Sequence, residues 1–163
     1  MDDLLSRFSG TLEPFVAINP TGMVEWIKSI SFDEWPQQRN PEQAPWMPSM
    51  LTNHHWHDFG KYIPEIETPL MQHFPGCRSA QQMLSVVIPG EHIWPHRDQQ
   101  PPEWRCRIHV PLITNDKSFM IMDDGSHNMK VGMSYRINTL ATHAIRNDGD
   151  IPRIHYMQDV ARV

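Results

Sequence analysis

The second half of the chain is a series of short β-rich segments that are separated by turn residues at nearly even spacing. Turn signals include the dipeptide Pro89-Gly90 and the clusters DDGS (123–126) and NDGD (147–150). The segments that we expect to form strands are 83–88, 105–112, 118–122, 129–131, 134–138, 142–146 and 153–157. Short strands joined by such turns are typical of antiparallel sandwiches and barrels. The spacing therefore predicts an all-β core from about Ala80 onward.

The first half is rich in proline and shows only short helical patterns. Thr21 is a candidate N-cap for one helix, and Pro69 fits the first turn of another that Pro75-Gly76 would end. The apolar residues that share a face in these two patterns are Met23, Val24, Ile27 and Ile30, and Ile66, Leu70 and Phe74. We expect one domain over residues 1–163, in which a helical and loop region (1–68) packs outside a core (69–163).

Length, charge and cysteine content limit the class of protein. A chain of 163 residues with 39% hydrophobic and 20% charged residues suits one globular domain. A net charge of −5 argues against binding to nucleic acid, which normally requires a basic excess. The longest apolar stretch, 83–88, is far shorter than the roughly 20 residues of a membrane helix. With two cysteines and no signal-peptide pattern, we expect a cytoplasmic protein with neither nucleic acid nor membrane as a partner.

The segment 105–112 alternates in an unusual way. One face carries Cys106, Ile108 and Val110, and the other carries two arginines and a histidine, Arg107 and His109 among them. On a solvated face such cations are ordinary. Inside a small barrel they need an anionic partner, because an unpaired buried cation is costly.

A metal site is indicated by His96-x-Asp98 and the later His143. In an extended segment, residues i and i+2 point to the same side, so His96 and Asp98 share a face. A histidine from a later strand completes a set of two imidazoles and one carboxylate. This set leaves three adjacent coordination positions open and is the facial triad of non-haem Fe(II) oxygenases.

Three stretches of the chain resemble the core of the aspartyl/asparaginyl β-hydroxylase family. They are SVVIPGEHIWPH (85–96), RIHVPL (107–112) and the segment from His143 through Asn147 and Gly149 to Arg153. The resemblance covers about residues 69–159. It implies a double-stranded β-helix, or cupin-like jelly roll, with short N-terminal helices packed outside. It also implies a dioxygenase that uses Fe(II), 2-oxoglutarate and O₂.

The resemblance assigns iron binding to His96 and His143. The family varies at the position of Asp98, where vertebrate protein-hydroxylating members have glycine and bacterial small-molecule members often have the carboxylate. Because this chain has Asp98, we expect the full triad His96, Asp98 and His143 to be both the metal ligands and the catalytic residues. A halogenase is not expected, since such enzymes leave the carboxylate position empty for a halide.

The resemblance also implies the site of the co-substrate. Arg153, helped by the Ser85 hydroxyl, is expected to bind the distal carboxylate of 2-oxoglutarate. Arg107 and His109 are expected near its other end, beside the carboxylate that chelates iron. Arginine's planar fork suits a carboxylate, and a dianionic co-substrate accounts for cations on an inward strand face.

The expected reaction is hydroxylation of an unactivated C–H bond, with release of succinate and CO₂. The expected substrate is a free amino acid, a short peptide or a related small molecule, and the loop 99–104 is expected to border its entrance. Three alternatives stay open: hydroxylation of Asp or Asn in a protein, a non-catalytic jelly-roll binding module, and a zinc hydrolase.

Other candidate residues have less specific signals. The cluster His54-His55-x-His57 is a possible second metal site, although adjacent histidines in a loop seldom converge. His155 shares a face with Arg153 and either faces the substrate, supports the site or is a satisfied barrel histidine. Neither cysteine is expected to be catalytic, because no Cys/His/Asn arrangement supports it.

Overall fold

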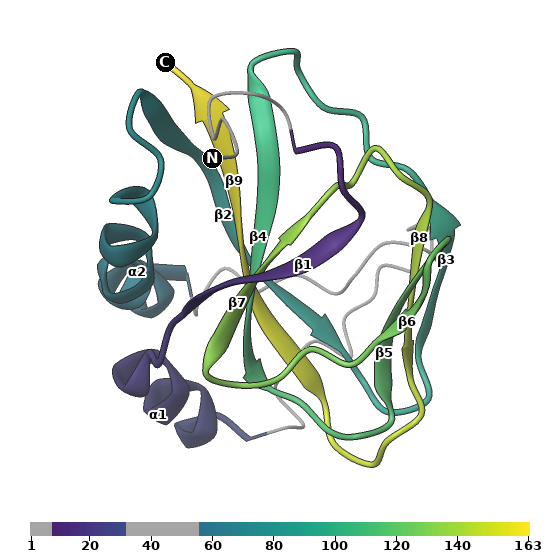
Figure 1. Cartoon of the computed structure of the whole chain (residues 1–163). Coiled ribbons are helices and arrows are strands. Elements are labelled where there is room, and N and C mark those ends of the chain that lie inside the picture. Colours follow the sequence, from purple (N-terminus) through teal and green to yellow (C-terminus); the bar gives the residue numbers. More distant parts are fainter. Residues whose placement is uncertain (1–7, 32–55) are drawn as a thin grey trace.

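The computed structural model describes residues 8–31 and 56–163, and these form two antiparallel sheets with two helices on one side (Figure 1). The five-stranded sheet has the order β1-β7-β4-β9-β2, and the four-stranded sheet has the order β3-β8-β5-β6. The strands are β1 (Leu12–Ala17), β2 (Cys77–Val87), β3 (His92–His96), β4 (Trp104–Ile113), β5 (Ser118–Met122), β6 (Gly125–His127), β7 (Met133–Ile137), β8 (His143–Asn147) and β9 (Arg153–Arg162). The jelly-roll fold expected from the sequence is confirmed.

The two helices cover the outer face of the five-stranded sheet. They are α1 (Thr21–Ser29) and α2 (Trp56–Met71). Their apolar faces join the outward-facing side chains of β2, β4 and β9 in one core. Its fully buried members include Met23, Ile27, Phe59, Ile66, Leu70, Leu84, Val86, Ile108 and Tyr156. The apolar faces expected for both helices therefore pack as the sequence indicates.

Several expected element bounds were wrong. The second helix begins at Trp56, so Pro69 lies near its end instead of in its first turn. The sixth strand is Gly125–His127 and not 129–131, because the chain reverses at Asp123-Asp124 and pairs at once with β5. The second strand starts at Cys77, since its pairing with β9 extends beyond the apolar run. Gly90, with a φ of 80°, makes the turn that follows this strand.

The sequence placed no strand before residue 80, and this was wrong as well. β1 pairs with β7 at the edge of the five-stranded sheet, with Leu12 opposite Ile137 and Glu13 opposite Arg136. The carboxylate of Glu13 also forms an ion pair with Arg136. The N-terminal region therefore supplies part of the sheet, and residue 69, which lies inside α2, is not a boundary of the folded core.

Alternation in the central strands decides what faces the space between the sheets. On β9, Ile154, Tyr156 and Val160 join the core under the helices. The alternate residues Arg153, His155, Met157 and Asp159 then point to the opposite face. The register places Arg107 opposite Asp159 and Ser85 opposite His155. Polar and charged side chains from three neighbouring strands thus meet on the inner face.

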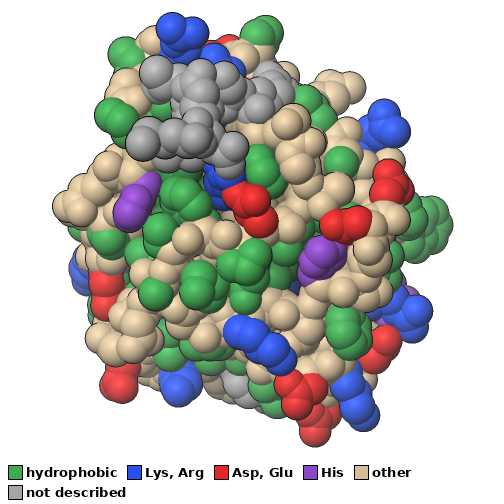
Figure 2. Space-filling model, viewed as in Figure 1, with side chains coloured by type: hydrophobic (Ala, Val, Ile, Leu, Met, Phe, Trp, Pro, Cys, Tyr) green, Lys and Arg blue, Asp and Glu red, His purple; other side chains and the backbone are tan. Residues whose placement is uncertain are grey.

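The outer surface differs from this interior. Acidic and basic side chains are interspersed over the face shown in Figure 2. Among the residues that the structure describes, neither helix has the length and apolar character to cross a bilayer.

The N-terminus of α1 is capped by the neighbouring helix. The N-cap position is Pro20 and not Thr21, and it makes no side-chain capping hydrogen bond. Instead, the amides of Gly22 and Met23 donate to the two carboxylate oxygens of Glu65 on α2, at 2.8 and 2.9 Å. This contact satisfies two of the free N–H groups and places a negative charge at the positive end of α1.

Replacing this cap is expected to destabilise the fold. Glu65→Ala should lower the free energy of unfolding by about 1 kcal/mol, measured by chemical denaturation. Glu25→Ala, at an exposed position on α1, is the matched control and should change it by less than about 0.5 kcal/mol. Equal losses in the two variants would contradict the capping role.

Candidate metal and co-substrate site

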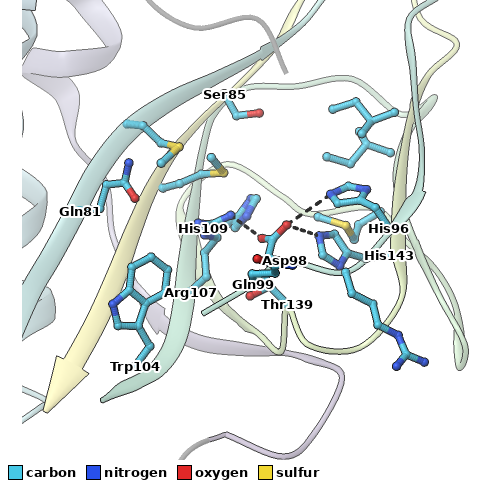
Figure 3. Close-up of a pocket in the computed structure, with 16 residues that line it drawn as sticks. Gln81, Ser85, His96, Asp98, Gln99, Trp104, Arg107, His109, Thr139 and His143 are labelled. Carbon is cyan, nitrogen blue, oxygen red and sulfur yellow. Dashed lines mark hydrogen bonds and ion pairs between the residues drawn. The ribbon is translucent and has the colours of Figure 1, made fainter. Parts of the chain in front are cut away.

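A cavity of ≈ 730 Å³ opens between the two sheets (Figure 3). The residues that line it come from both sheets, from the segment after β3 and from the connection between β7 and β8. They are Gln81, Met83, Ser85, Ile93, His96, Arg97, Asp98, Gln99, Trp104, Arg107, His109, Met120, Thr139, His143, Ile145 and Met157. Six of the seven residues expected at the site are among them. The seventh, Arg153, does not line the cavity but donates a hydrogen bond to Ser85, which does.

The structure brings His96, Asp98 and His143 together on one wall of this cavity. His96 ends β3 and lies opposite His143, the first residue of β8, in the strand register. Asp98 follows two residues later, and its amide donates to the carbonyl of Thr139 at 2.9 Å. One ligand atom from each of the three residues lies within 4.8 Å of the others. This group can hold a metal ion, as expected for the triad.

Backbone contacts orient both imidazoles for metal binding. The Nδ1 atom of His96 lies 2.7 Å from the carbonyl of Trp94, and that of His143 lies 2.8 Å from the carbonyl of Ala141. Because a carbonyl only accepts, each Nδ1 carries the hydrogen in these contacts. In this tautomer the lone pair lies on Nε2, the atom that would bind a metal. Burial also lowers the pKa of His143, which favours the neutral form that binds metals.

Oδ1 of Asp98 faces both histidines. It lies 3.5 Å from Nε2 of His96 and 3.9 Å from Nε2 of His143. Its other oxygen, Oδ2, accepts a hydrogen bond from Nη1 of Arg107 at 2.8 Å. The three ligand groups thus converge from a strand end, a strand start and a loop.

Arg107 is held between two carboxylates. Besides its contact with Asp98, it donates from Nε and Nη2 to the two oxygens of Asp159, at 2.7 and 3.0 Å. Burial raises the pKa of Asp159, and the hydrogen bond from Arg107 opposes that effect. The sequence indicated that this arginine needs an anionic partner. The partner found here is Asp159, which sequence reasoning missed although it shares a face with Arg153, His155 and Met157.

Arg153 has a different environment. It is 1% exposed, and its Nη1 donates to the Ser85 hydroxyl at 3.2 Å. Its Nη2 is buried without a hydrogen-bond partner among the described residues. Burial lowers the pKa of Arg153 to about 9, so the side chain is still a cation at neutral pH. A buried guanidinium with an unused donor beside a cavity is suited to bind an anion.

His109 and His155 form a buried pair next to this arginine. Their Nδ1 atoms are 3.2 Å apart, so one must carry a hydrogen and the other must accept it. Burial, together with the charge of Arg153, holds the pKa of both histidines well below the usual value. Both rings are therefore neutral in the folded protein. His155 supports His109 from behind instead of lining the cavity.

This pair makes the stability of the apoprotein depend on pH. The folded pKa values lie below the unfolded value of about 6.5. The free energy of unfolding is therefore at its full value above that pH and decreases as the pH falls below it, because the unfolded chain then binds protons that the folded protein does not. Between pH 7.5 and 5.5, each histidine should lower the free energy of unfolding by about 1 kcal/mol. Denaturant titrations at both pH values measure this loss.

The variant His155→Gln should show a smaller loss between the two pH values, because one of the two groups is gone. His73→Gln, which replaces an exposed histidine, should retain the wild-type dependence. A loss that is the same in all three proteins would mean that the buried pair does not titrate on unfolding.

The remaining sequence expectations have mixed outcomes. Gln99 and Trp104, from the loop expected at the entrance, do line the cavity. Trp94, two residues before His96, is 60% exposed and is not among the residues that line the cavity. Burial raises the pKa of the Cys106 thiol to about 12, in agreement with a packing role. His54, His55 and the side chain of His57 lie outside the described residues.

The structure is a two-sheet jelly roll with a His-Asp-His group in its cavity. Comparison with known proteins identifies the family to which a chain with this fold and site belongs. The family model for aspartyl/asparaginyl beta-hydroxylase matches residues 25–163. The chain therefore belongs to the aspartyl/asparaginyl β-hydroxylase family, as the sequence motifs suggested. It is a member of a hydroxylase family, and the binding-module and zinc-hydrolase alternatives are not favoured.

Individual relatives are more distant. The human aspartyl/asparaginyl beta-hydroxylase is 40% identical over 47 residues, which make up 27% of this chain and only 6% of the human protein. AviO1 from Streptomyces viridochromogenes Tue57 has a TM-score of 0.61 at 10% identity, covering 93% of this chain and 89% of that one. The viral collagen prolyl hydroxylase of Paramecium Bursaria Chlorella virus-1, solved with 2OG, has a TM-score of 0.57 at 11% identity over 95% and 98% of the chains. These structures share the fold.

Proposed function

We propose that the protein is an Fe(II)- and 2-oxoglutarate-dependent dioxygenase that hydroxylates an unactivated C–H bond of a small molecule. The observation that carries this proposal is that the cavity has a His-Asp-His group on its wall and a buried arginine hydrogen-bonded to one of its lining residues, Ser85. That group can hold a metal, and one donor of the arginine is buried without a partner among the described residues. A zinc hydrolase has no use for the second feature, whereas a dicarboxylate co-substrate needs it.

The donor set fits both groups. His96, Asp98 and His143 would hold Fe(II), and two imidazoles with one carboxylate leave positions open for other ligands. Arg153 and Ser85 would bind the distal carboxylate of 2-oxoglutarate. His109 lines the cavity and is neutral, so it would contribute a hydrogen bond without adding charge.

The bound metal, with 2-oxoglutarate and O₂, supplies the oxidising chemistry that converts C–H to C–OH while succinate and CO₂ are released. The protein supplies geometry and recognition. His96 and His143 keep Nε2 directed at the metal through their Nδ1 contacts. Ile93, Met120 and Ile145 give this wall of the cavity an apolar lining that limits water around the reacting bond.

The cavity supports a substrate of small size. A volume of ≈ 730 Å³ lies within the range of small-molecule sites, and it must hold both the co-substrate and the substrate group. Gln81, Gln99 and Trp104 line the cavity at a distance from Ser85, as Figure 3 shows. Two amides and an indole offer hydrogen bonds and an apolar face to the substrate. A free amino acid, a short peptide or a related small molecule fits this description.

The first test is co-substrate binding. Anaerobic addition of Fe(II) and then 2-oxoglutarate to the apoprotein should produce the weak visible charge-transfer band of chelated iron. His143→Ala should abolish the band. Arg153→Met should weaken the affinity for 2-oxoglutarate by about 30-fold or more, since a buried charge pair is lost. Arg146→Met, which removes a half-exposed arginine on β8, is the matched control and should bind as wild type does.

Stability gives a second measurement that is independent of the iron. Since the Arg153 guanidinium is buried and incompletely paired in the apoprotein, Arg153→Met should leave the apoprotein as stable or make it more stable. A wild-type protein with no band and no affinity for 2-oxoglutarate would refute the dioxygenase assignment. If the band does appear, succinate release with candidate substrates would define the substrate.

A further inference from the structure

We propose that Asp159 is a positioning residue for Asp98 and that it acts through Arg107. The inference rests on the metal site of the proposed function. The three side chains form a continuous series from β9, an interior strand of the five-stranded sheet, to the metal-binding wall. Two hydrogen bonds join Asp159 to Arg107, and one joins Arg107 to Asp98. Figure 3 shows the last contact.

The two ends of this series differ in how firmly the fold holds them. Asp159 lies on β9, which pairs with β4 on one side and β2 on the other, and its side chain is 1% exposed. Arg107 lies opposite Asp159 in the strand register and is largely buried. Asp98 instead follows the end of β3, outside any strand, and its side chain is 21% exposed. Asp98 therefore needs an external contact to hold its carboxylate in place.

The geometry of arginine makes it a suitable connector. A bidentate contact fixes the plane of the guanidinium, because both N–H groups on that edge must meet the two oxygens of Asp159. With the plane fixed, the direction of Nη1 is fixed too, and it points at Oδ2 of Asp98. A lysine at this position could not transmit an orientation, since its ammonium group is a point charge.

The hydrogen bond from Arg107 gives the two oxygens of Asp98 different surroundings. Oδ2 is occupied by Arg107, and Oδ1 faces the Nε2 atoms of His96 and His143. Asp98 thus presents one oxygen to the metal position. Loss of Asp159 would release the guanidinium plane, and Asp98 would then lose its fixed direction while both histidines keep their backbone contacts.

The test measures the affinity for Co(II) alone, without co-substrate, by calorimetry and visible absorption. Asp159→Asn keeps the size of the side chain but turns an N–H group toward the guanidinium. It should weaken cobalt binding by about 10-fold or more. Asp159→Glu, which retains the charge, should recover part of that affinity. Gln158→Leu, buried on the opposite face of β9, controls for lost stability and should change the affinity by less than about twofold.

A double-mutant cycle separates positioning from general support. In an Asp98→Ala background, titrated to millimolar cobalt so that a weak two-histidine site is still measured, Asp159→Asn should have almost no further effect. An equal loss of affinity in both backgrounds would overturn the inference, and so would wild-type affinity in Asp159→Asn.

Two further outcomes are distinguishable from these. If Asp159→Asn does not fold, Arg107→Lys is measured instead. It should also weaken cobalt binding, and this effect should disappear in the Asp98→Ala background. A wild-type protein that binds no cobalt would refute the metal site of the proposed function and with it the inference. If the wild-type protein binds cobalt and Asp159→Asn binds it equally well, the inference is refuted and the metal site of the proposed function is not.

Discussion

The architecture depends on how charge is balanced between the two sheets. The five-stranded sheet buries its outer face under α1 and α2, so the alternate side chains of β2, β4 and β9 must face inward. Several of these are charged or polar, and burial of such groups is costly unless they are paired. Among the described residues, Arg107 is paired with Asp159 and Asp98, whereas the hydrogen-bond partner of Arg153 is the neutral Ser85. Arg107 therefore has carboxylate partners within the protein, whereas Arg153 has a buried donor that suits a ligand.

The metal-binding group depends on the meeting of separate segments. His96 and His143 are opposite each other in the β3–β8 register, although 46 positions separate them in the chain. Asp98 joins them from a loop, tied by its amide to Thr139 and by its carboxylate to Arg107. Two strand ends supply directed imidazoles, and the inner face of the other sheet orients the carboxylate. Both sheets therefore contribute to one site.

Much of the site was predictable because strand periodicity is local. The alternation in 105–112 separated Cys106, Ile108 and Val110 from Arg107 and His109, and the structure has the same division. The strand at β1 was not predictable in this way. Its burial pattern shows no regular alternation, since it lies at a sheet edge and is defined by pairing with β7. Asp159 was missed for a related reason, because nothing near it in the chain shows that a cation lies opposite.

The sequence by itself determined most strands of the second half, the family, and the residue types of the candidate site, but not β3 or the position of β6. These follow from periods of two residues, from turn residues with restricted backbone preferences, and from motif spacing. The tertiary structure decided which side chains are partners. It assigned Asp159 to Arg107 and paired His109 with His155, and within the described part of the chain it left one donor of Arg153 without a partner. Such partnerships join positions far apart in the chain, and they depend on strand order and register, which no local pattern specifies.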